Sequence, residues 1–359
     1  MGEIGRLPIG IQSFEDIIRG RFLYVDKTKF VYDLVSQTKQ YFLARPRRFG
    51  KSLFLSTLQA YFLGKKDLFS GLALEQKELE LAQEEGREPW LSYPVLYLDL
   101  NSKKYETETD LDTILCAHLT DWETSYGIVP RSDSPELRFS YLMEQIHAKS
   151  GRQVVFLVDE YDKPLIQTLK KPELNEEYRA TLKAFFGCLK SCDAHVKFAF
   201  LTGVTKFSQV SVFSDLNHLN DISMTPRFDA ICGMTEEELQ RTFPREIENL
   251  AEKNRQSVEE SLAQLKRLYD GYHFSYECEG MYNPFSVLNT LFKETYSNYW
   301  FQTGTPTFLL EELKRNDYDL REIASGVTAM EGRLHAVPRR QRQPHTAVVP
   351  ERLPDHQGV

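Results

Sequence analysis

Three short apolar runs constrain the fold of this chain more than any other feature of its sequence. They are PVLYLDL at 94–100, VVFLVDE at 154–160 and VKFAFLTG at 196–203. Each run is continuous rather than alternating, which is typical of strands in a sheet that is covered on both faces. Helical patterns separate them, around residues 110–126, 136–149 and 175–190. Strands that alternate with helices predict a parallel α/β sheet.

A phosphate-binding sequence follows an earlier apolar run of strand length, YFLA at 41–44. The segment ARPRRFGKSLF leads from this run into an amphipathic helix. The predicted core positions of the helix are Leu53, Leu55, Leu58 and Phe62. Gly50, Lys51 and Ser52 match the end of a Walker A loop, in which lysine reaches the β- and γ-phosphates and the serine hydroxyl binds Mg²⁺. We expect an exposed loop; a basic turn on a solvated surface is the alternative interpretation.

The same loop carries three arginines, and Arg45 stands where the first glycine of GxxxxGKS is usual. The guanidinium group suits bidentate contacts with phosphate, so Arg45 and Arg48 are candidate phosphate ligands beside Gly50. Arginine fingers, or a patch that Arg47 and its neighbours present to a nucleic-acid backbone, remain alternatives.

Two carboxylates end the apolar run VVFLVDE and give it the form of a Walker B strand. Asp159 is expected to hold Mg²⁺ through water, and Glu160 to polarise the attacking water. A buried strand that ends in a solvated acidic turn is the other interpretation. The two motifs stand in the expected order, each at the end of a predicted strand, where α/β sheets bind their ligands.

A third polar element lies at the end of VKFAFLTG. Thr202 or Thr205 is a candidate sensor of the γ-phosphate, although hydroxyls that cap the strand exit explain the pattern equally well. Lys206 and Arg227 are candidate cations for the charge that develops in the transition state, with a solvated surface position as the alternative.

The composition excludes several classes of protein. Acidic residues (52) outnumber lysine and arginine (44), and the net charge of −8 argues against a broad surface for nucleic-acid phosphates. No apolar run approaches the ~18 residues of a membrane span, and no signal peptide is recognisable, so we expect a cytoplasmic protein without membrane contact. The five cysteines are scattered, which is typical of reduced thiols, and no histidine stands where it would complete a metal site.

Several long blocks, read in order, resemble the bacterial AAA-ATPase-like family. They are GIQSFEDIIRGRFLYVDKTKFVYDLV, FLARPRRFGKSLFLSTLQAYF, VVFLVDEYDKPL and FLTGVTKFSQVSVFSDLNHLNDIS. With YDGYHF, YNPFSVLN and YWFQTGTPTFL, the resemblance extends over about residues 7–325. It implies ATP binding, and it makes Arg45 a family trait, because the family loop reads RPRRFGKS. In this family a PD-(D/E)XK nuclease-like domain usually follows the ATPase region.

These observations predict four consecutive parts. Residues 1–230 form a P-loop NTPase-type α/β domain with a parallel sheet and flanking helices. Residues 231–300 form a small helical lid, which reads as all-helical from Thr235 to about Leu291. Residues 301–335 begin a truncated nuclease-like module, and residues 336–359 form a disordered tail.

The predicted function is ATP binding and Mg²⁺-dependent ATP hydrolysis with Glu160 as the base, in a protein without a nuclease site of its own. The alternative is a nucleotide-gated binding module, in which ATP holds a conformation that recruits a protein or nucleic acid with little turnover. A third interpretation is a nucleic-acid binder that uses the RPRR segment, against which the net charge weighs. An oligomer is compatible with each of these.

The tail carries the first testable prediction. After Leu334 the sequence is rich in proline and arginine and has no aromatic residue. We interpret this as a single-base frameshift, real or from sequencing, because shifted codons from Arg339 onward permit an aromatic and aliphatic string. Such a tail has too little apolar surface to offset the entropy of ordering. Reading the gene tests the hypothesis: the shifted frame after Val337 should continue as a strand-rich sequence, and an immediate stop codon would contradict it.

Overall fold

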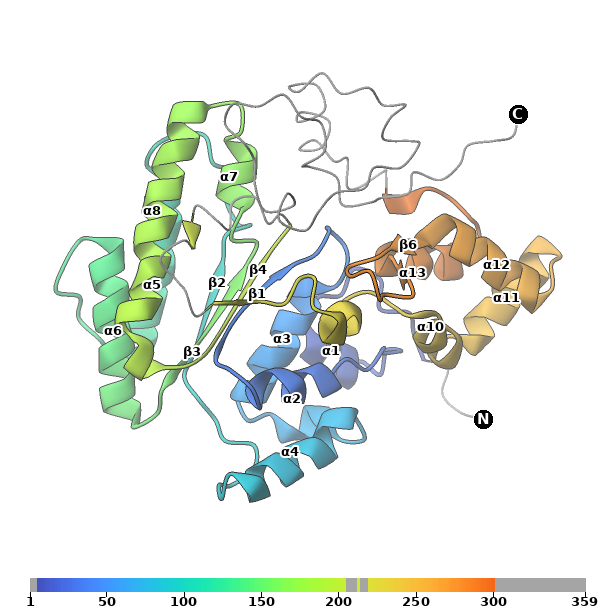
Figure 1. Ribbon diagram of the computed structural model, residues 1–359, viewed down its shortest axis with the longest axis horizontal. Coiled ribbons are helices and arrows are strands. Elements are labelled where there is room, and N and C mark those ends of the chain that lie inside the picture. Colours follow the sequence, from blue (N-terminus) through green and yellow to red (C-terminus); the bar gives the residue numbers. More distant parts are fainter. Residues whose placement is uncertain (1–4, 205–211, 214–218, 301–359) are drawn as a thin grey trace.

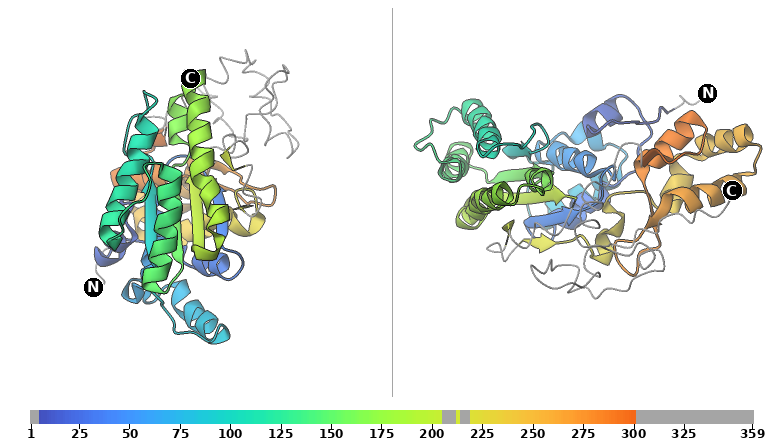
Figure 2. Two further views of the ribbon diagram at one scale, coloured as in Figure 1. Left: turned by 90° about the vertical axis from the view of Figure 1, so that its left-hand side faces the viewer. Right: turned by 90° about the horizontal axis from the view of Figure 1, so that it is seen from above.

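Five parallel strands form the central sheet, and helices lie on both of its faces (Figures 1 and 2). The computed structural model describes residues 5–204, 212–213 and 219–300. In their order across the sheet, the strands are β2 (Val95–Asp99), β3 (Val154–Asp159), β4 (Val196–Gly203), β1 (Gln40–Ala44) and β5 (Asn220–Asp221). Each pairing between neighbours is parallel, so the predicted α/β class is confirmed.

Burial on both faces explains why these strands read as unbroken apolar runs. All six residues of β3 are buried, and the five apolar ones alternate between two separate clusters of core side chains. Phe156 and Val158 belong to one cluster, whereas Val155 and Leu157 belong to the other. The period of two along the strand therefore gives both faces of the sheet apolar surface to bury.

Each face of the sheet is covered by its own group of helices. One group is α5 (Asp110–Tyr126), α6 (Pro135–Ser150), α7 (Lys163–Gln167) and α8 (Pro172–Ser191). The other group is α1 (Phe14–Arg19), α2 (Lys29–Val35), α3 (Lys51–Phe62) and α4 (Ala73–Glu84). Short 3₁₀ turns complete the domain: η1 (Lys66–Phe69), η2 (Asp193–His195) and η3 (Pro226–Ile231). Among the predicted core positions of α3, only Leu53 differs, because it is partly rather than fully buried.

A separate core lies under the helices that follow η3. They are α10 (Glu236–Thr242), α11 (Pro244–Asn254), α12 (Val258–Tyr269) and α13 (Pro284–Lys293). Capping boxes begin α10 at Thr235 and α12 at Ser257, and the Asn283 side chain caps α13 by accepting from the Ser286 amide. The all-helical prediction for this stretch is wrong in one respect. A two-stranded antiparallel hairpin, β6 (Asp270–Tyr272) with β7 (Met281–Tyr282), interrupts it, since strands this short leave no periodic pattern.

A buried ion pair joins this helical part to the N-terminal segment. The Lys27 ammonium lies 2.6 Å from the Glu238 carboxylate, and each side chain is only 10% exposed. Glu238 also accepts a hydrogen bond from the backbone amide of Thr235, as the capping box of α10 requires. The same carboxylate therefore caps the start of α10 and neutralises a buried cation on the N-terminal segment. Moving the two segments apart would leave a buried charge without its partner.

A second buried cation, Arg45, fixes the start of the loop after β1. Its guanidinium donates to the carbonyl oxygens of Ala44 (3.0 Å), Ser223 (2.7 Å) and Phe228 (2.9 Å). It lies 3.9 Å from the ring centroid of Phe274, a cation–π contact. Burial lowers the pKa of this guanidinium to about 10, so it remains charged at neutral pH. The side chain thus binds together β1, the segment after β5, η3 and the hairpin region.

Phe49, near the end of the same loop, strengthens this connection. Its ring packs edge-on against Tyr272 and Phe274, with centroid distances of 4.6 and 5.5 Å. Its carbonyl oxygen accepts from the amide of Gly233 at 3.0 Å. Arg45 therefore holds the start of the loop, and Phe49 holds its end. Both side chains contact segments that precede the helical part or lie within it.

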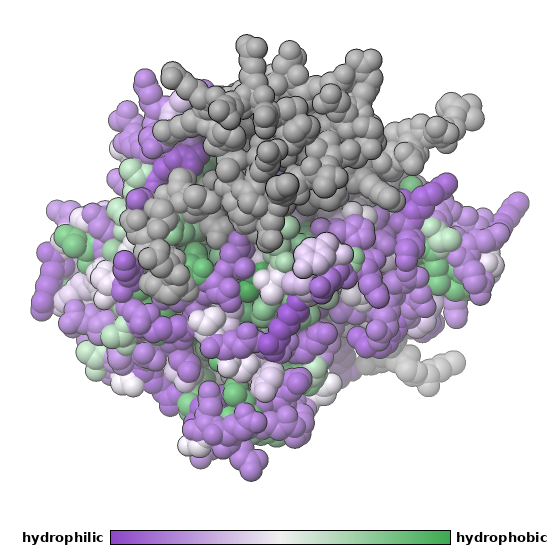
Figure 3. Space-filling model, viewed as in Figure 1, coloured by the Kyte–Doolittle hydropathy of each residue, from purple (hydrophilic) through white to green (hydrophobic). Residues whose placement is uncertain are grey.

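Hydrophilic residues predominate over the described part of the face in Figure 3, and hydrophobic ones lie in small separate groups. Within the described ranges, no helix combines the length and the apolar character that crossing a membrane requires. The predicted module at 301–335 and tail at 336–359 lie outside the described residues. The boundaries of the four predicted parts stay predictions.

Replacing Arg45 by methionine should lower the free energy of unfolding by roughly 2–4 kcal/mol, because two buried carbonyl oxygens lose their donor while the apolar contact with Phe274 is kept. Urea unfolding followed by tryptophan fluorescence measures the loss. Arg47→Met, a half-exposed position in the same loop, is the matched control and should change stability by less than about 0.5 kcal/mol. Equal effects of the two substitutions would show that the Arg45 guanidinium does not anchor the loop.

Candidate functional site

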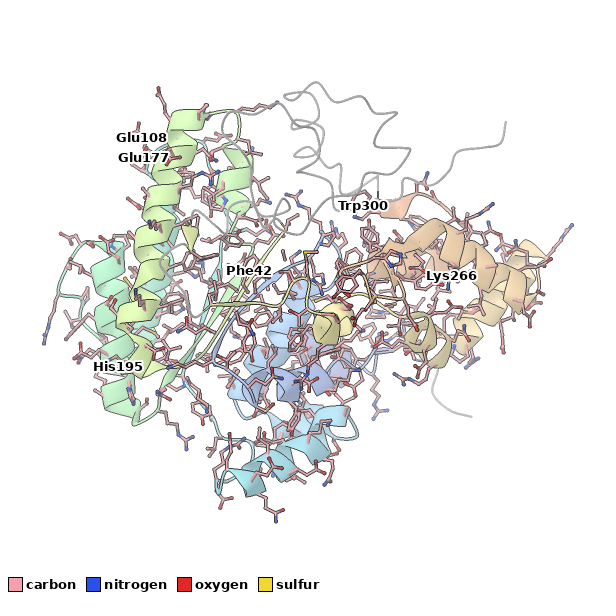
Figure 4. The ribbon with its side chains drawn as sticks, viewed as in Figure 1. Phe42, Glu108, Glu177, His195, Lys266 and Trp300 are labelled. Carbon is pink, nitrogen blue, oxygen red and sulfur yellow. The ribbon has the colours of Figure 1, made fainter. Side chains whose placement is uncertain are left out.

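A cavity of about 420 Å³ opens where β1 and β3 end, between the loop after β1 and the first turn of α13. This is the carboxyl edge of the parallel sheet, opposite the edge marked by His195, which is labelled in Figure 4 and precedes β4. Arg47 to Phe54 line one side of the cavity, Pro8 to Gln12 another, and Pro284 and Phe285 of α13 a third. A more open depression of about 580 Å³ at 106–109 and 171–174 contains none of the residues singled out in the sequence.

The predicted Walker A residues meet at the beginning of α3. Gly50 is the N-cap and has φ 96°, a left-handed conformation that glycine adopts without steric cost. Lys51 is the first residue of the helix and Ser52 the second, and all three line the cavity. The backbone N–H groups of a first helical turn have no partner within the helix, so they can bind an anion there. The loop therefore presents the arrangement that phosphate binding needs.

Lys51 itself is buried, which corrects the expectation of an exposed loop. Its side chain donates to the carbonyl oxygens of Arg45 (2.9 Å) and Pro46 (3.1 Å), and the residue is 5% exposed. Burial lowers the pKa of its ammonium, whereas the nearby carboxylates, Glu160 foremost, raise it. The ammonium is thus largely removed from water and is held between loop carbonyls and the acids that follow β3.

The two Walker B carboxylates are adjacent in sequence but differ in environment. Asp159, the last residue of β3, is 6% exposed and accepts a hydrogen bond from Thr202 Oγ1 at 2.8 Å. Glu160 lies on the wall of the cavity. Its φ of 51° is unusual for a residue other than glycine, and the peptide that follows it is fixed because Tyr161 N donates to Thr202 O at 3.0 Å. The sharp turn sends one carboxylate into the interior and the next to the cavity.

Thr202 lies beside Asp159 because β4 stands between β1 and β3 in the sheet. Its Cα is paired with that of Leu43 on β1, and Leu201 is paired with Val158 on β3. The Thr202 side chain is fully buried and donates to Asp159 Oδ1. Sensing of the γ-phosphate by Thr202 stays a prediction, and in this geometry the hydroxyl acts on the Asp159 carboxylate.

The loop arginines separate into two groups. Arg45 was expected to bind phosphate, but its guanidinium is bound to backbone carbonyls in the interior, so this expectation does not fit its position. Arg48 is exposed and lines the cavity, with its guanidinium 5.0 Å from the ring centroid of Phe285 on α13. Arg227 pairs with Asp33 of α2 at 2.6 Å and does not belong to the cavity wall. Thr205 and Lys206 lie outside the described residues.

Asn101 and Lys163 are among the polar residues of the cavity wall that sequence reasoning missed. Asn101 follows β2, and Lys163 begins α7 after the turn at the end of β3. The Lys163 ammonium donates to Asn101 Oδ1 at 2.7 Å and lies 3.8 Å from the Glu160 carboxylate. The signal was present, because YDKP follows the two predicted Walker B acids directly and Asn101 follows the preceding predicted strand.

The cavity is polar at one end and apolar at the other. Gly50, Lys51 and Ser52 line the polar end together with Glu160 and Lys163. The apolar wall includes Pro8, Ile9, Ile11, Met234, Phe243 and Leu288. Such a cavity fits a ligand that has an anionic group at one end and a flat apolar group at the other. The Ser52 hydroxyl at the polar end, and the Asp159 carboxylate buried beside Glu160, carry oxygen atoms of the kind that Mg²⁺ prefers.

Comparison with known proteins agrees with this geometry. The sequence profile of the AAA-ATPase-like family, described as "Predicted AAA-ATPase", matches residues 8–213. A protein of Azotobacter chroococcum mcd 1, described as "Uncharacterized protein in vnfD 5'region", is 41% identical over 310 residues. The match covers 86% of this chain and 56% of that protein, so the chain spans about half the length of this relative. No solved structure matches the chain. The chain belongs to the AAA-ATPase-like family.

Proposed function

We propose that this protein binds ATP at the polar end of the cavity and hydrolyses it with Mg²⁺. The observation that supports the proposal best is the meeting of three features in one cavity: the loop with Lys51, the N-terminus of α3, and Glu160 on the opposite wall. The loop supplies binding for phosphates, and a carboxylate beside them can polarise a water molecule. The apolar end of the cavity gives the base and ribose a place away from water.

The residues fit a bound Mg²⁺. The Asp159 carboxylate is buried, and Thr202 satisfies only its Oδ1 oxygen at normal hydrogen-bond distance. The other oxygen has Tyr97 at 3.5 Å, a distance too long for a strong hydrogen bond. A buried charge with unused acceptor capacity is well suited to a water ligand of a cation. When bound, the ion would neutralise charge on the β- and γ-phosphates.

Each residue of the chain then has a definite task. Lys51 exchanges two carbonyl partners for phosphate oxygens, which carry full charge and form the stronger hydrogen bonds. The α3 amides orient the phosphates through the same helix terminus. Glu160 accepts a hydrogen bond from the attacking water, and its rigid backbone turn keeps the carboxylate at the cavity wall. Thr202 orients Asp159.

The contact between Arg48 and Phe285 favours a second candidate function, a nucleotide-gated binding module. It links the phosphate loop to α13 across the cavity. Phosphates that attract the Arg48 guanidinium would compete with this contact and change how α13 packs. Binding of ATP would then control a surface of the helical part with little need for turnover.

Replacing Lys51 by alanine should weaken ATP binding roughly tenfold or more, because a charge-assisted contact to phosphate contributes about 1.5–3 kcal/mol. Titration calorimetry with ATP and Mg²⁺ measures the affinity. Lys66→Ala removes the same charge at an exposed position after α3 and should leave the affinity unchanged. If Lys51→Ala binds ATP as tightly as the unaltered protein, the cavity is not a P-loop site.

Replacing Glu160 by glutamine separates hydrolysis from binding. Steady-state release of phosphate should fall about 100-fold or more, because a general base contributes that much, while ATP affinity should be retained. Glu108→Gln, at an exposed position outside this cavity, is the control and should not slow the reaction. Phosphate release that is absent from the unaltered protein, together with ATP binding, would instead support the nucleotide-gated module.

A further inference from the structure

We propose that Lys163 binds the γ-phosphate of the nucleotide and, in doing so, exchanges its ion pair with Glu160 for one with the phosphate. The inference rests on the proposed ATP site and adds to it the residue that distinguishes a triphosphate from a diphosphate. The proposal depends on the contacts that Lys163 makes with Asn101 and Glu160.

The position of Lys163 follows from the sheet. Strands β2 and β3 are parallel neighbours, with Asp99 paired to Asp159, so the loops that leave them emerge side by side. Asn101 comes from the first loop, and Glu160 and Lys163 come from the second. All three line the cavity. They form its wall on the β3 side, whereas Lys51 belongs to the loop after β1.

The contacts of Lys163 leave it free to take an anionic partner. Its Nζ donates to Asn101 Oδ1 at 2.7 Å, which uses one of the three donors of an ammonium. The Glu160 carboxylate lies 3.8 Å away, close enough for electrostatic attraction but beyond hydrogen-bond distance. The side chain is 18% exposed. Asn101 therefore holds the ammonium in place while its charge is matched only loosely.

The other cations of the cavity wall come from other segments than Lys163. Of the lysines and arginines that line it in the described residues, Lys27 is paired with buried Glu238 at 2.6 Å. Lys51 is bound by its own loop, and Arg47 and Arg48 belong to that same loop. Lys163 alone of this set comes from the side of Glu160. A nucleotide held by the loop at its β-phosphate would extend its γ-phosphate toward this side.

The exchange of partners has a chemical consequence. The γ-phosphate carries more charge than a carboxylate and offers several oxygens, so it attracts the ammonium more strongly than Glu160 does at 3.8 Å. Once Lys163 has turned to the phosphate, the Glu160 carboxylate no longer has this ion pair and accepts a hydrogen bond from water without competition from Lys163. A diphosphate does not reach Lys163 and leaves the Glu160 pair unchanged.

The test compares the affinities of ADP and of the β,γ-imido analogue of ATP, both with Mg²⁺. Lys163→Met should weaken binding of the analogue about tenfold or more and change ADP binding less than about twofold, because one charge-assisted contact is lost for the γ-phosphate alone. Lys163→Arg keeps the charge and should retain most of the preference for the analogue. Asn101→Ala should also reduce the preference for the analogue over ADP, because it removes the residue that holds the Lys163 ammonium.

Lys104→Met is the matched control, because Lys104 is exposed, lies three residues after Asn101 and does not line the cavity. It should change neither affinity. Equal weakening of both ligands by Lys163→Met, or no weakening, would overturn the assignment of Lys163. If Lys51→Ala still weakens both ligands in that case, the proposed ATP site stands; if the unaltered protein binds neither ligand, both proposals fail.

Discussion

The position of the phosphate loop depends on the buried guanidinium of Arg45. A charge that is 1% exposed is tolerated only where fixed dipoles replace water, and here carbonyl oxygens of β1, of the segment after β5 and of η3 do so. The loop usually begins with a glycine, whereas here it begins with a side chain that is bound into the core. Because Phe274 covers the same guanidinium, the loop, the edge of the sheet and the helical part share one anchor.

The position of β4 between β1 and β3 determines how the loop after β1 and the acids at the end of β3 are connected. If these strands were neighbours, the loop and the acids would adjoin directly. With β4 between them, Thr202 lies at the carboxyl edge and donates to Asp159, while its backbone carbonyl fixes the turn that aims Glu160 at the cavity. One residue of β4 therefore controls the orientation of both acids. The geometry of the candidate site therefore depends on three strands rather than on two motifs alone.

The sequence predicts the elements that leave a local pattern along the chain. It does not predict contacts that depend on the direction of a side chain. Strands β1 to β4 were found because burial on both faces leaves continuous apolar runs, whereas β5, with two residues, leaves no pattern. The residues of each motif were predicted because they are adjacent in the sequence. The inward direction of Arg45 depends on acceptors such as Phe228 that lie far away in sequence. The pairing of Lys163 with Asn101 likewise depends on the register of neighbouring strands, which composition does not reveal.

The contacts between the helical part and the α/β domain differ greatly in strength, and this limits where a ligand can cause movement. Breaking the buried pair of Lys27 and Glu238 costs about 3–5 kcal/mol, because it strands a buried charge. The contact of exposed Arg48 with Phe285 is worth only about 0.5–1 kcal/mol. A ligand shifts an equilibrium by no more than its difference in affinity for the two states. If phosphates bind beside Arg48 as proposed, they can displace the start of α13, while α10 stays attached to the N-terminal segment through Lys27.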